Sequence, residues 1–164
     1  MKLVFSIVTL LALAMPAAAQ QTIFLVRHAE RADASPGAAP MMASDPDLSE
    51  AGKARAQSLA AALKDAKITA IYTTQYKRTR QTAEPLATAL GIQATVVDAL
   101  DLPLLAEKIK AGGNALVVAH SNTIAPVLQQ LGIAESVTVG DEDYDNLFVV
   151  VRGDKATLVR LHFR

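Results

Sequence analysis

The chain has 164 residues, which is enough for one domain of ordinary size and too few for two. Its 16 basic and 16 acidic residues give a formal net charge of zero, so no overall field attracts nucleic acid or an anionic membrane. The sequence contains no cysteine, which excludes disulfides, cysteine nucleophiles and thiolate metal sites.

The first segment of the chain has the pattern of an export signal. Lys2 precedes an uncharged apolar run over residues 3–15, and the alanines at 17–19 match a small-residue cleavage site. The apolar run is too short to cross a bilayer comfortably. We therefore predict a signal peptide at 1–19, a mature domain at 20–164 without stable membrane insertion, and a periplasmic or extracellular location. An uncleaved anchor is the alternative.

Strands and helices alternate through the rest of the chain. Short runs of apolar residues predict strands buried on both faces, and apolar residues recurring at helical spacing predict amphipathic helices. Pro85 indicates either a kink in its helix or a later helix start. In chain order, the sequence predicts a strand at 22–26, a loop at 31–46, a helix at 49–65, a strand at 68–73, a helix at 79–90, a strand at 92–97, a helix at 102–110, a strand at 115–118, a helix at 123–131 and a hairpin with strands at 146–151 and 156–163.

This alternation predicts a single α/β domain with three layers, α/β/α. We expect a mostly parallel sheet of about six strands, because a helix that joins two parallel strands returns the chain to the same end of the sheet. The hairpin near the C-terminus, joined at residues 152–155, would add an antiparallel edge strand.

Two histidines follow predicted strands directly. His28 comes after the first strand, next to Arg27, and His120 comes just after the strand at 115–118. Ligands of open parallel sheets bind beyond the carboxyl ends of the strands. We therefore expect both imidazoles to face one crevice. His162 lies inside the last predicted strand and has no such placement.

Groups that bind anions gather at the same predicted crevice. Ser121-Asn122-Thr123 offers N-cap residues for the helix that follows, and the free amides at a helix N-terminus attract anions. Arg27 and Arg78 add guanidinium groups, whose planar set of donors suits phosphate. We expect the neighbouring Lys77 and Arg80 to be solvated. The sequence thus predicts a phosphate site.

Four segments resemble the signature motifs of the histidine phosphatase superfamily, which includes the cofactor-dependent phosphoglycerate mutases. They occur in the family's order, and the short chain is similar to the compact bacterial branch that includes phosphohistidine phosphatases. The segments are Phe24-Leu25-Val26-Arg27-His28-Ala29-Glu30, Asp45-Pro46-Asp47-Leu48-Ser49-Glu50-Ala51-Gly52, Tyr72-Thr73-Thr74-Gln75-Tyr76-Lys77-Arg78-Thr79-Arg80-Gln81-Thr82-Ala83 and Val117-Val118-Ala119-His120-Ser121. Ala29 departs from the family's usual glycine, and its methyl group is tolerated if φ there is negative.

The resemblance implies a phosphatase that uses neither a metal nor a cofactor. It implies that His28 attacks phosphorus and forms a phosphohistidine, which water then hydrolyses. Attack requires a neutral imidazole whose other nitrogen is held by a backbone carbonyl. We expect His28, His120, Arg27 and Arg78 to be catalytic, and Arg27, Arg78, His120 and Ser121 to bind the phosphate oxygens.

The group that protonates the leaving group is not evident. The resemblance implies a glutamate general acid, and this sequence has no clear counterpart of it. Glu30, Asp98, Asp101 and an acidic loop at 141–145 are the candidates, and the sequence does not decide among them. A phosphoramidate that is already protonated would need no acid.

A metal site built from His28, Glu30 and His120 is the chemical rival of the phosphatase. Two basic side chains beside these ligands argue against a bound cation.

The predicted substrate is a phosphomonoester or phosphoramidate on a small molecule or on a larger carrier. The natural substrate and the oligomeric state stay open. One alternative is a phosphate-binding module without turnover, which Ala29 and the missing acid favour. Another is a mutase, for which the short chain leaves little room.

Overall fold

The computed structural model describes residues 20–32 and 45–163. The predicted signal peptide at 1–19 and positions 33–44 of the predicted loop lie outside these residues. Among the described helices, none combines the length and the apolar character that crossing a membrane requires.

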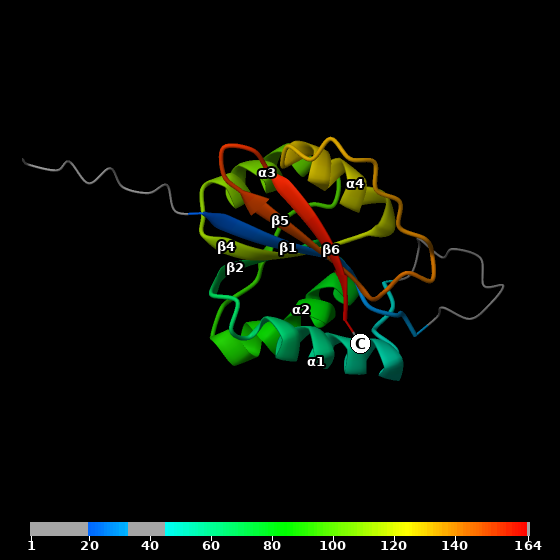
Figure 1. Ribbon diagram of the computed structural model, residues 1–164. Coiled ribbons are helices and arrows are strands. Elements are labelled where there is room, and N and C mark those ends of the chain that lie inside the picture. Colours follow the sequence, from blue (N-terminus) through cyan, green and yellow to red (C-terminus); the bar gives the residue numbers. More distant parts are fainter. Residues whose placement is uncertain (1–19, 33–44, 164) are drawn as a thin grey trace, which may run out of the picture.

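Strands and helices alternate as predicted (Figure 1). Their bounds are β1 Gln21–Arg27, α1 Glu50–Leu63, β2 Ile68–Thr73, α2 Lys77–Leu90, β3 Thr95–Val96, α3 Leu102–Lys110, β4 Asn114–Ala119, α4 Ser121–Gln130, β5 Asn146–Arg152 and β6 Thr157–His162.

All the described strands join in one sheet with the order β3-β2-β4-β1-β5-β6. The pairs β1–β4, β4–β2 and β2–β3 are parallel, whereas β5 pairs antiparallel with β1 and β6 pairs antiparallel with β5. The predicted sheet, mostly parallel with antiparallel pairing at its C-terminal edge, is therefore confirmed.

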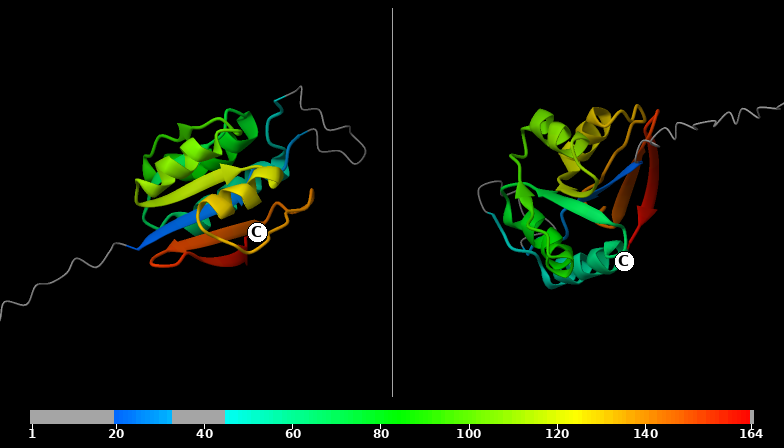
Figure 2. Two further views of the ribbon diagram at one scale, coloured as in Figure 1. Left: turned by 90° about the horizontal axis from the view of Figure 1, so that it is seen from above. Right: turned by 90° about the vertical axis from the view of Figure 1, so that its left-hand side faces the viewer.

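Helices cover both faces of the sheet, with α1 and α2 on one side and α3 and α4 on the other (Figure 2). Successive side chains of β1 point to opposite faces: Leu25 packs among the residues of α3 and α4, and Val26 packs among those of α1 and α2. Both side chains are fully buried, which explains why this strand is a continuous apolar run. The three-layer α/β/α prediction is confirmed.

Helix α2 begins at Lys77, two residues before the predicted start. Its N-cap, Tyr76, makes no side-chain cap, and the carboxylate of Asp45 instead accepts from the Lys77 amide at 2.8 Å. A cap supplied from another part of the chain leaves no local signal, so propensity placed the start too late. Pro85 lies inside the helix, and the alternative of a later start is therefore wrong.

The strand predicted at 92–97 is reduced to Thr95–Val96. It is an edge strand that pairs with β2 only at Tyr72 and Thr73, and both of its residues are exposed. An apolar run does not disclose how many partners a strand will have. The predicted length was therefore wrong.

Candidate active site

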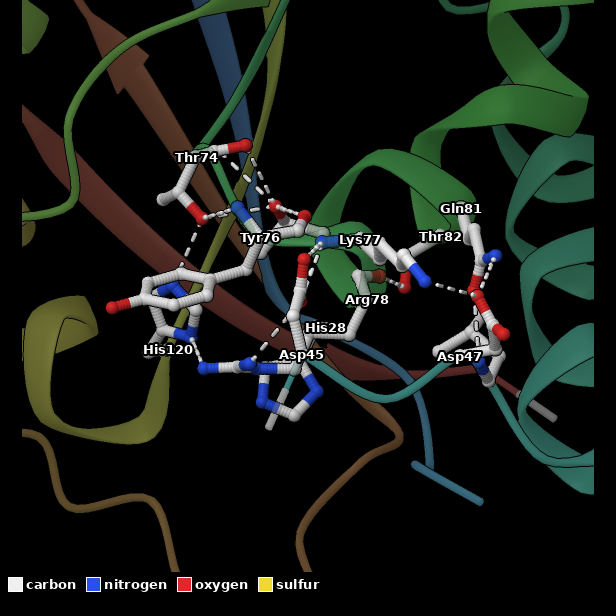
Figure 3. A network of polar contacts seen from close by, with 12 residues as sticks. His28, Asp45, Asp47, Thr74, Tyr76, Lys77, Arg78, Gln81, Thr82 and His120 are labelled. Atoms are coloured by element: carbon white, nitrogen blue, oxygen red, sulfur yellow. Dashed lines mark hydrogen bonds and ion pairs between the residues drawn. The ribbon is translucent and has the colours of Figure 1, made fainter. Parts of the chain in front are cut away.

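Two adjacent parallel strands place the two histidines side by side. Arg27 and Ala119 are register partners at the ends of β1 and β4, and the amide of His28 donates to the carbonyl of Ala119 at 2.9 Å. His120 follows Ala119 directly. The two imidazole rings lie 5.4 Å apart between centroids, inclined at 63° (Figure 3). The two imidazoles therefore lie together at the carboxyl edge of the sheet, as their positions after two strands predict.

His28 is held as one tautomer. Its Nδ1–H donates to the carbonyl of Ala29 at 2.8 Å, because a carbonyl can only accept, and the lone pair is left on Nε2. Burial lowers the pKa of His28 to about 3, and the positive charges of Arg27 and Arg78 act in the same direction. The ring is therefore neutral near pH 7, with one nitrogen available for attack.

His120 is the N-cap of α4 and is also uncharged. Burial lowers its pKa to about 4, with further lowering by Arg78 and Arg27. Nε2 lies 3.0 Å from the hydroxyl oxygen of Thr74, and Nδ1 lies 3.5 Å from Nη2 of Arg78. The prediction that Ser121-Asn122-Thr123 caps this helix is wrong in register, since Thr123 is the third helical residue and its hydroxyl accepts from the His120 amide.

Residues from the C-terminal part of the chain hold the side chain of Arg27 in place. Its Nη1 donates to the carbonyls of Gly140 and Asp141 at 2.8 and 2.9 Å, and its guanidinium stacks on the ring of Tyr144 at 4.2 Å. The side-chain Nε is buried and has no hydrogen-bond partner among the described residues. A buried donor without an acceptor is costly, unless a ligand supplies the acceptor.

Arg78 lies in the first turn of α2 and is equally buried. Its guanidinium stacks on the ring of Tyr76 at 4.3 Å, and its Nη1 lies 3.9 Å from a carboxylate oxygen of Asp45. The structure thus gathers the four predicted side chains, Arg27, His28, Arg78 and His120, at one edge of the sheet.

Sequence reasoning missed Tyr76 and Tyr144. Each ring stacks on one of the two arginines, and each also lies near a histidine: Tyr76 is 5.4 Å from His120 and Tyr144 is 6.2 Å from His28, between ring centroids. Tyr76 stands within the segment that resembles the central arginine motif, so its proximity to Arg78 was a usable signal. Tyr144 is remote in sequence from Arg27, and nothing in the sequence pointed to that pairing.

Ser121 was a further candidate ligand, whereas Lys77 and Arg80 were expected to be solvated. Ser121 is the first residue of α4, adjacent to His120 and half-buried. Lys77 and Arg80 are exposed, and Lys77 lies 3.7 Å from a carboxylate oxygen of Asp47. The interpretation of Lys77 and Arg80 as solvated cations agrees with this exposure.

The alanine that replaces the family's glycine fits without strain. Ala29 is not among the described residues with positive φ, and its side chain is buried against Leu48 and Ala56. Its amide donates to the hydroxyl of Thr82 in α2 at 2.9 Å, and that hydroxyl donates to the carbonyl of Arg78. The segment after His28 is thereby tied to the helix that carries Arg78.

The carboxylate of Glu30 pairs with Arg55, which is outside the cluster of four side chains. Its carboxylate lies 2.6 Å from Nη2 of Arg55 and also accepts from Nε of the same arginine. Burial alone would raise the pKa of Glu30, but the hydrogen bonds and charge of Arg55 hold it below its usual value. An ionised carboxylate paired in this way is a poor proton donor.

Four of the other acidic candidates, Asp98, Asp101, Asp143 and Asp145, are held in capping or pairing contacts. Asp101 caps α3 by accepting from the Leu104 amide, and Asp143 accepts from the amide of Gly140. Asp98 is exposed and accepts from the Leu100 amide, whereas Asp145 lies 3.1 Å from Nδ1 of His162. In the part of the chain that the structure describes, no group of three or more histidine or carboxylate side chains is arranged to hold a metal ion.

Comparisons with known proteins agree with this fold. The structure is similar to the protein histidine phosphatase SixA complexed with tungstate, with a TM-score of 0.65 and 18% identity over 87% of this chain and 97% of that chain. A putative phosphohistidine phosphatase SixA from Agrobacterium tumefaciens gives a TM-score of 0.61 and 25% identity over 84% of this chain and 97% of that chain. The mycobacterial glucosyl-3-phosphoglycerate phosphatase in complex with VO3 gives a TM-score of 0.69 and 17% identity, over 84% of this chain and 97% of that chain.

The comparison with curated proteins found no match. The model of the histidine phosphatase superfamily (branch 1) matches residues 23–101, which include Arg27, His28 and Arg78. His120 lies beyond the matched segment, and the fold returns it to the side of His28. Residues 23–101 thus carry the sequence pattern of the histidine phosphatase superfamily, branch 1.

Proposed function

We propose that this phosphatase is a metal-independent hydrolase that transfers the phosphoryl group of a phosphomonoester or phosphoramidate to His28. The match to the histidine phosphatase superfamily and the phosphatases among the structurally similar proteins support phosphatase activity. The observation that carries the finer proposal is the neutral, single tautomer of His28, with a carbonyl on Nδ1 and the lone pair on Nε2.

The reaction has two displacements at phosphorus. In the first, Nε2 of His28 attacks, the bond from phosphorus to the leaving group breaks, and the leaving group departs with its electron pair and takes up a proton. In the second, water attacks phosphorus, the P–N bond breaks, and inorganic phosphate leaves with His28 restored. Arg27, Arg78 and His120 would stabilise the charge on the phosphoryl oxygens in both displacements.

The surroundings of His28 support an anionic guest. Two buried arginines flank the imidazole, and the buried Nε of Arg27 has no acceptor among the described residues. A phosphate oxygen would satisfy such a donor, and Ser121 at the N-terminus of α4 is a further candidate ligand. Two of the structurally similar proteins are complexes with tungstate and with VO3, which are oxyanions.

The contacts of Glu30 favour a leaving group that needs little help from an acid. The best-placed carboxylate in sequence is tied to Arg55 and stays ionised. Aryl phosphates and protonated phosphoramidates leave without a strong general acid. We therefore propose that these two classes are turned over faster than alkyl phosphates. We further propose that a small molecule or a larger carrier bears the phosphate. The pattern at residues 1–19 supports an exported location.

The decisive test is His28→Ala. We expect hydrolysis of p-nitrophenyl phosphate to fall by at least about a thousandfold, because the nucleophile is lost. His162→Ala is the matched control, since His162 is a half-exposed residue of β6 whose ring contacts Asp145 instead of the site. Full activity of the His28→Ala protein would refute the proposal.

Trapping distinguishes turnover from simple binding. Brief exposure to a ³²P-labelled substrate should leave an acid-labile, alkali-stable label on the wild-type protein and none on His28→Ala. Binding of vanadate without any label or hydrolysis would identify a phosphate-binding module instead.

A further inference from the structure

A buried hydroxyl of Thr74, outside the residues discussed so far as ligands, contacts the second histidine. Thr74 follows β2 directly, and its Oγ1 lies 3.0 Å from Nε2 of His120 and 2.9 Å from Oγ1 of Thr79 (Figure 3). Both threonines are buried. A buried chain of three polar groups has few ways to place its protons.

The hydrogen bonds that join Thr79, Thr74 and His120 have a single consistent set of donors and acceptors. Thr79 has one hydroxyl proton, and its Oγ1 lies 2.8 Å from the carbonyl of Tyr76, which can only accept. With that proton committed, the hydroxyl of Thr74 donates to Thr79. Oγ1 of Thr74 is then left as an acceptor, so the proton between Thr74 and His120 belongs to Nε2 of the ring.

The opposite side of the ring leads independently to the same tautomer. Nη2 of Arg78 lies 3.5 Å from Nδ1 of His120, and a guanidinium group can only donate. Nδ1 therefore presents a lone pair toward Arg78. A proton on Nδ1 would instead set one donor against another.

We propose that Thr74 is a positioning residue that holds His120 with its proton on Nε2, so that Nδ1 is the nitrogen presented to the phosphoryl group beside Arg78. This inference rests on the proposed function. When a dianionic phosphoryl group binds, Nδ1 takes up a proton from bulk solvent, and the new N–H donates a hydrogen bond to a phosphoryl oxygen while Nε2–H still donates to Oγ1 of Thr74. Both N–H groups of the resulting imidazolium are then hydrogen-bonded.

The charges that lower the pKa of His120 are those of Arg78 from α2 and Arg27 from β1. The titratable rings of His28 and Tyr76 also face His120, each with its centroid 5.4 Å from the centroid of that ring. The charges of the two arginines disfavour a second proton on His120. A dianion reverses that balance only if the ring keeps an acceptor for Nε2–H, and Thr74 is that acceptor.

Thr74→Val tests the inference, because valine keeps the shape and removes the acceptor. In ¹⁵N spectra of the wild-type protein, His120 should show a protonated Nε2 and an unprotonated Nδ1. In Thr74→Val, we expect a mixture of tautomers and a roughly tenfold lower kcat/KM, the size of one lost hydrogen bond. Thr74→Ser restores the hydroxyl and should recover both properties.

Thr73→Val is the matched control. Thr73 precedes Thr74, is 2% exposed, and its Oγ1 has no hydrogen-bond partner among the described residues. This variant should leave the tautomer and kcat/KM unchanged. An unaltered tautomer and rate in Thr74→Val, with an active wild-type enzyme, would overturn the inference and leave the proposed function intact. Full activity of His28→Ala would overturn the proposed function whatever Thr74 does.

Discussion

Each arginine of the site is held by an aromatic ring as well as by polar partners. Arg27 stacks on Tyr144 and donates to two carbonyls, whereas Arg78 stacks on Tyr76 and lies near Asp45 and His120. Stacking restricts a guanidinium group without consuming its in-plane N–H donors. The rings therefore hold both cations in place, and the buried Nε of Arg27 remains as a donor for an oxyanion.

Two substitutions of Tyr144 separate the work of the ring from that of the hydroxyl. Tyr144→Phe keeps the stack on Arg27 and removes only a 3.5 Å contact with Nη2, so we expect kcat/KM within about threefold of wild type. Tyr144→Ala removes the stack and should lower kcat/KM by about tenfold. The measurement is the rate with p-nitrophenyl phosphate and with an alkyl phosphate. A large loss in Tyr144→Phe confined to the alkyl phosphate would instead identify the phenol as the missing proton donor.

The sequence predicted which arginine and histidine side chains form the site, but it did not predict the residues that hold those side chains in place. Arg27, His28, Arg78 and His120 each stand next to a recognisable strand or helix boundary, so the topology implied that they converge. Thr74, Tyr76 and Tyr144 act through distances and ring orientations, which no spacing along the chain encodes. The tie between Glu30 and Arg55 was missed for the same reason.

Among the elements, α1 supports the site through a close backbone approach. Gly52, in the first turn of α1, lies so near the carbonyl of Glu30 that an added Cβ would sit 2.2 Å from its oxygen. The same carbonyl accepts from the amide of Ser49, the N-cap of α1. A backbone contact of this kind cannot relax by a rotamer change.

Gly52→Ala should therefore destabilise the protein by about 3 kcal/mol, since α1 must move away from the segment after His28. Urea unfolding measures the loss. Gly153→Ala is the control, because an added Cβ there meets no atom within 4 Å and its φ is not positive. Equal free energies of unfolding for the two variants would show that α1 can move away from the Glu30 carbonyl without destabilising the protein.

How far each element was predictable follows from what stabilises it. Buried strands β1, β2 and β4 are apolar on both faces, so composition alone marked them. Helix α1 carries its own cap in Ser49, and its start was placed correctly. The start of α2 depends on Asp45 and the length of β3 depends on its one neighbour. Those two features are tertiary, and both predictions failed.

Across the whole molecule, a net charge of zero conceals a concentrated positive site. Arg27 and Arg78 are both buried at one edge of the sheet, beside two imidazoles whose positive charge the fold suppresses. Selectivity for an anion is thus local. Burying these groups away from water lowers the free energy of unfolding, and a bound oxyanion would raise it again.

That cost should appear as acid sensitivity. An unfolded histidine has a pKa near 6.5, whereas the folded values are about 3 for His28 and about 4 for His120, so the unfolded chain binds more protons below pH 6.5. Stability should fall between pH 7 and pH 5 by about 2 kcal/mol for each of the two rings. Urea titrations at both pH values measure the fall. His28→Asn, which keeps an N–H for the Ala29 carbonyl, should remove about half of it, and saturating vanadate should offset it. An unchanged pH dependence in His28→Asn would mean that His28 has the same pKa in the folded and unfolded chains, so that burial does not keep the folded ring neutral at pH 5.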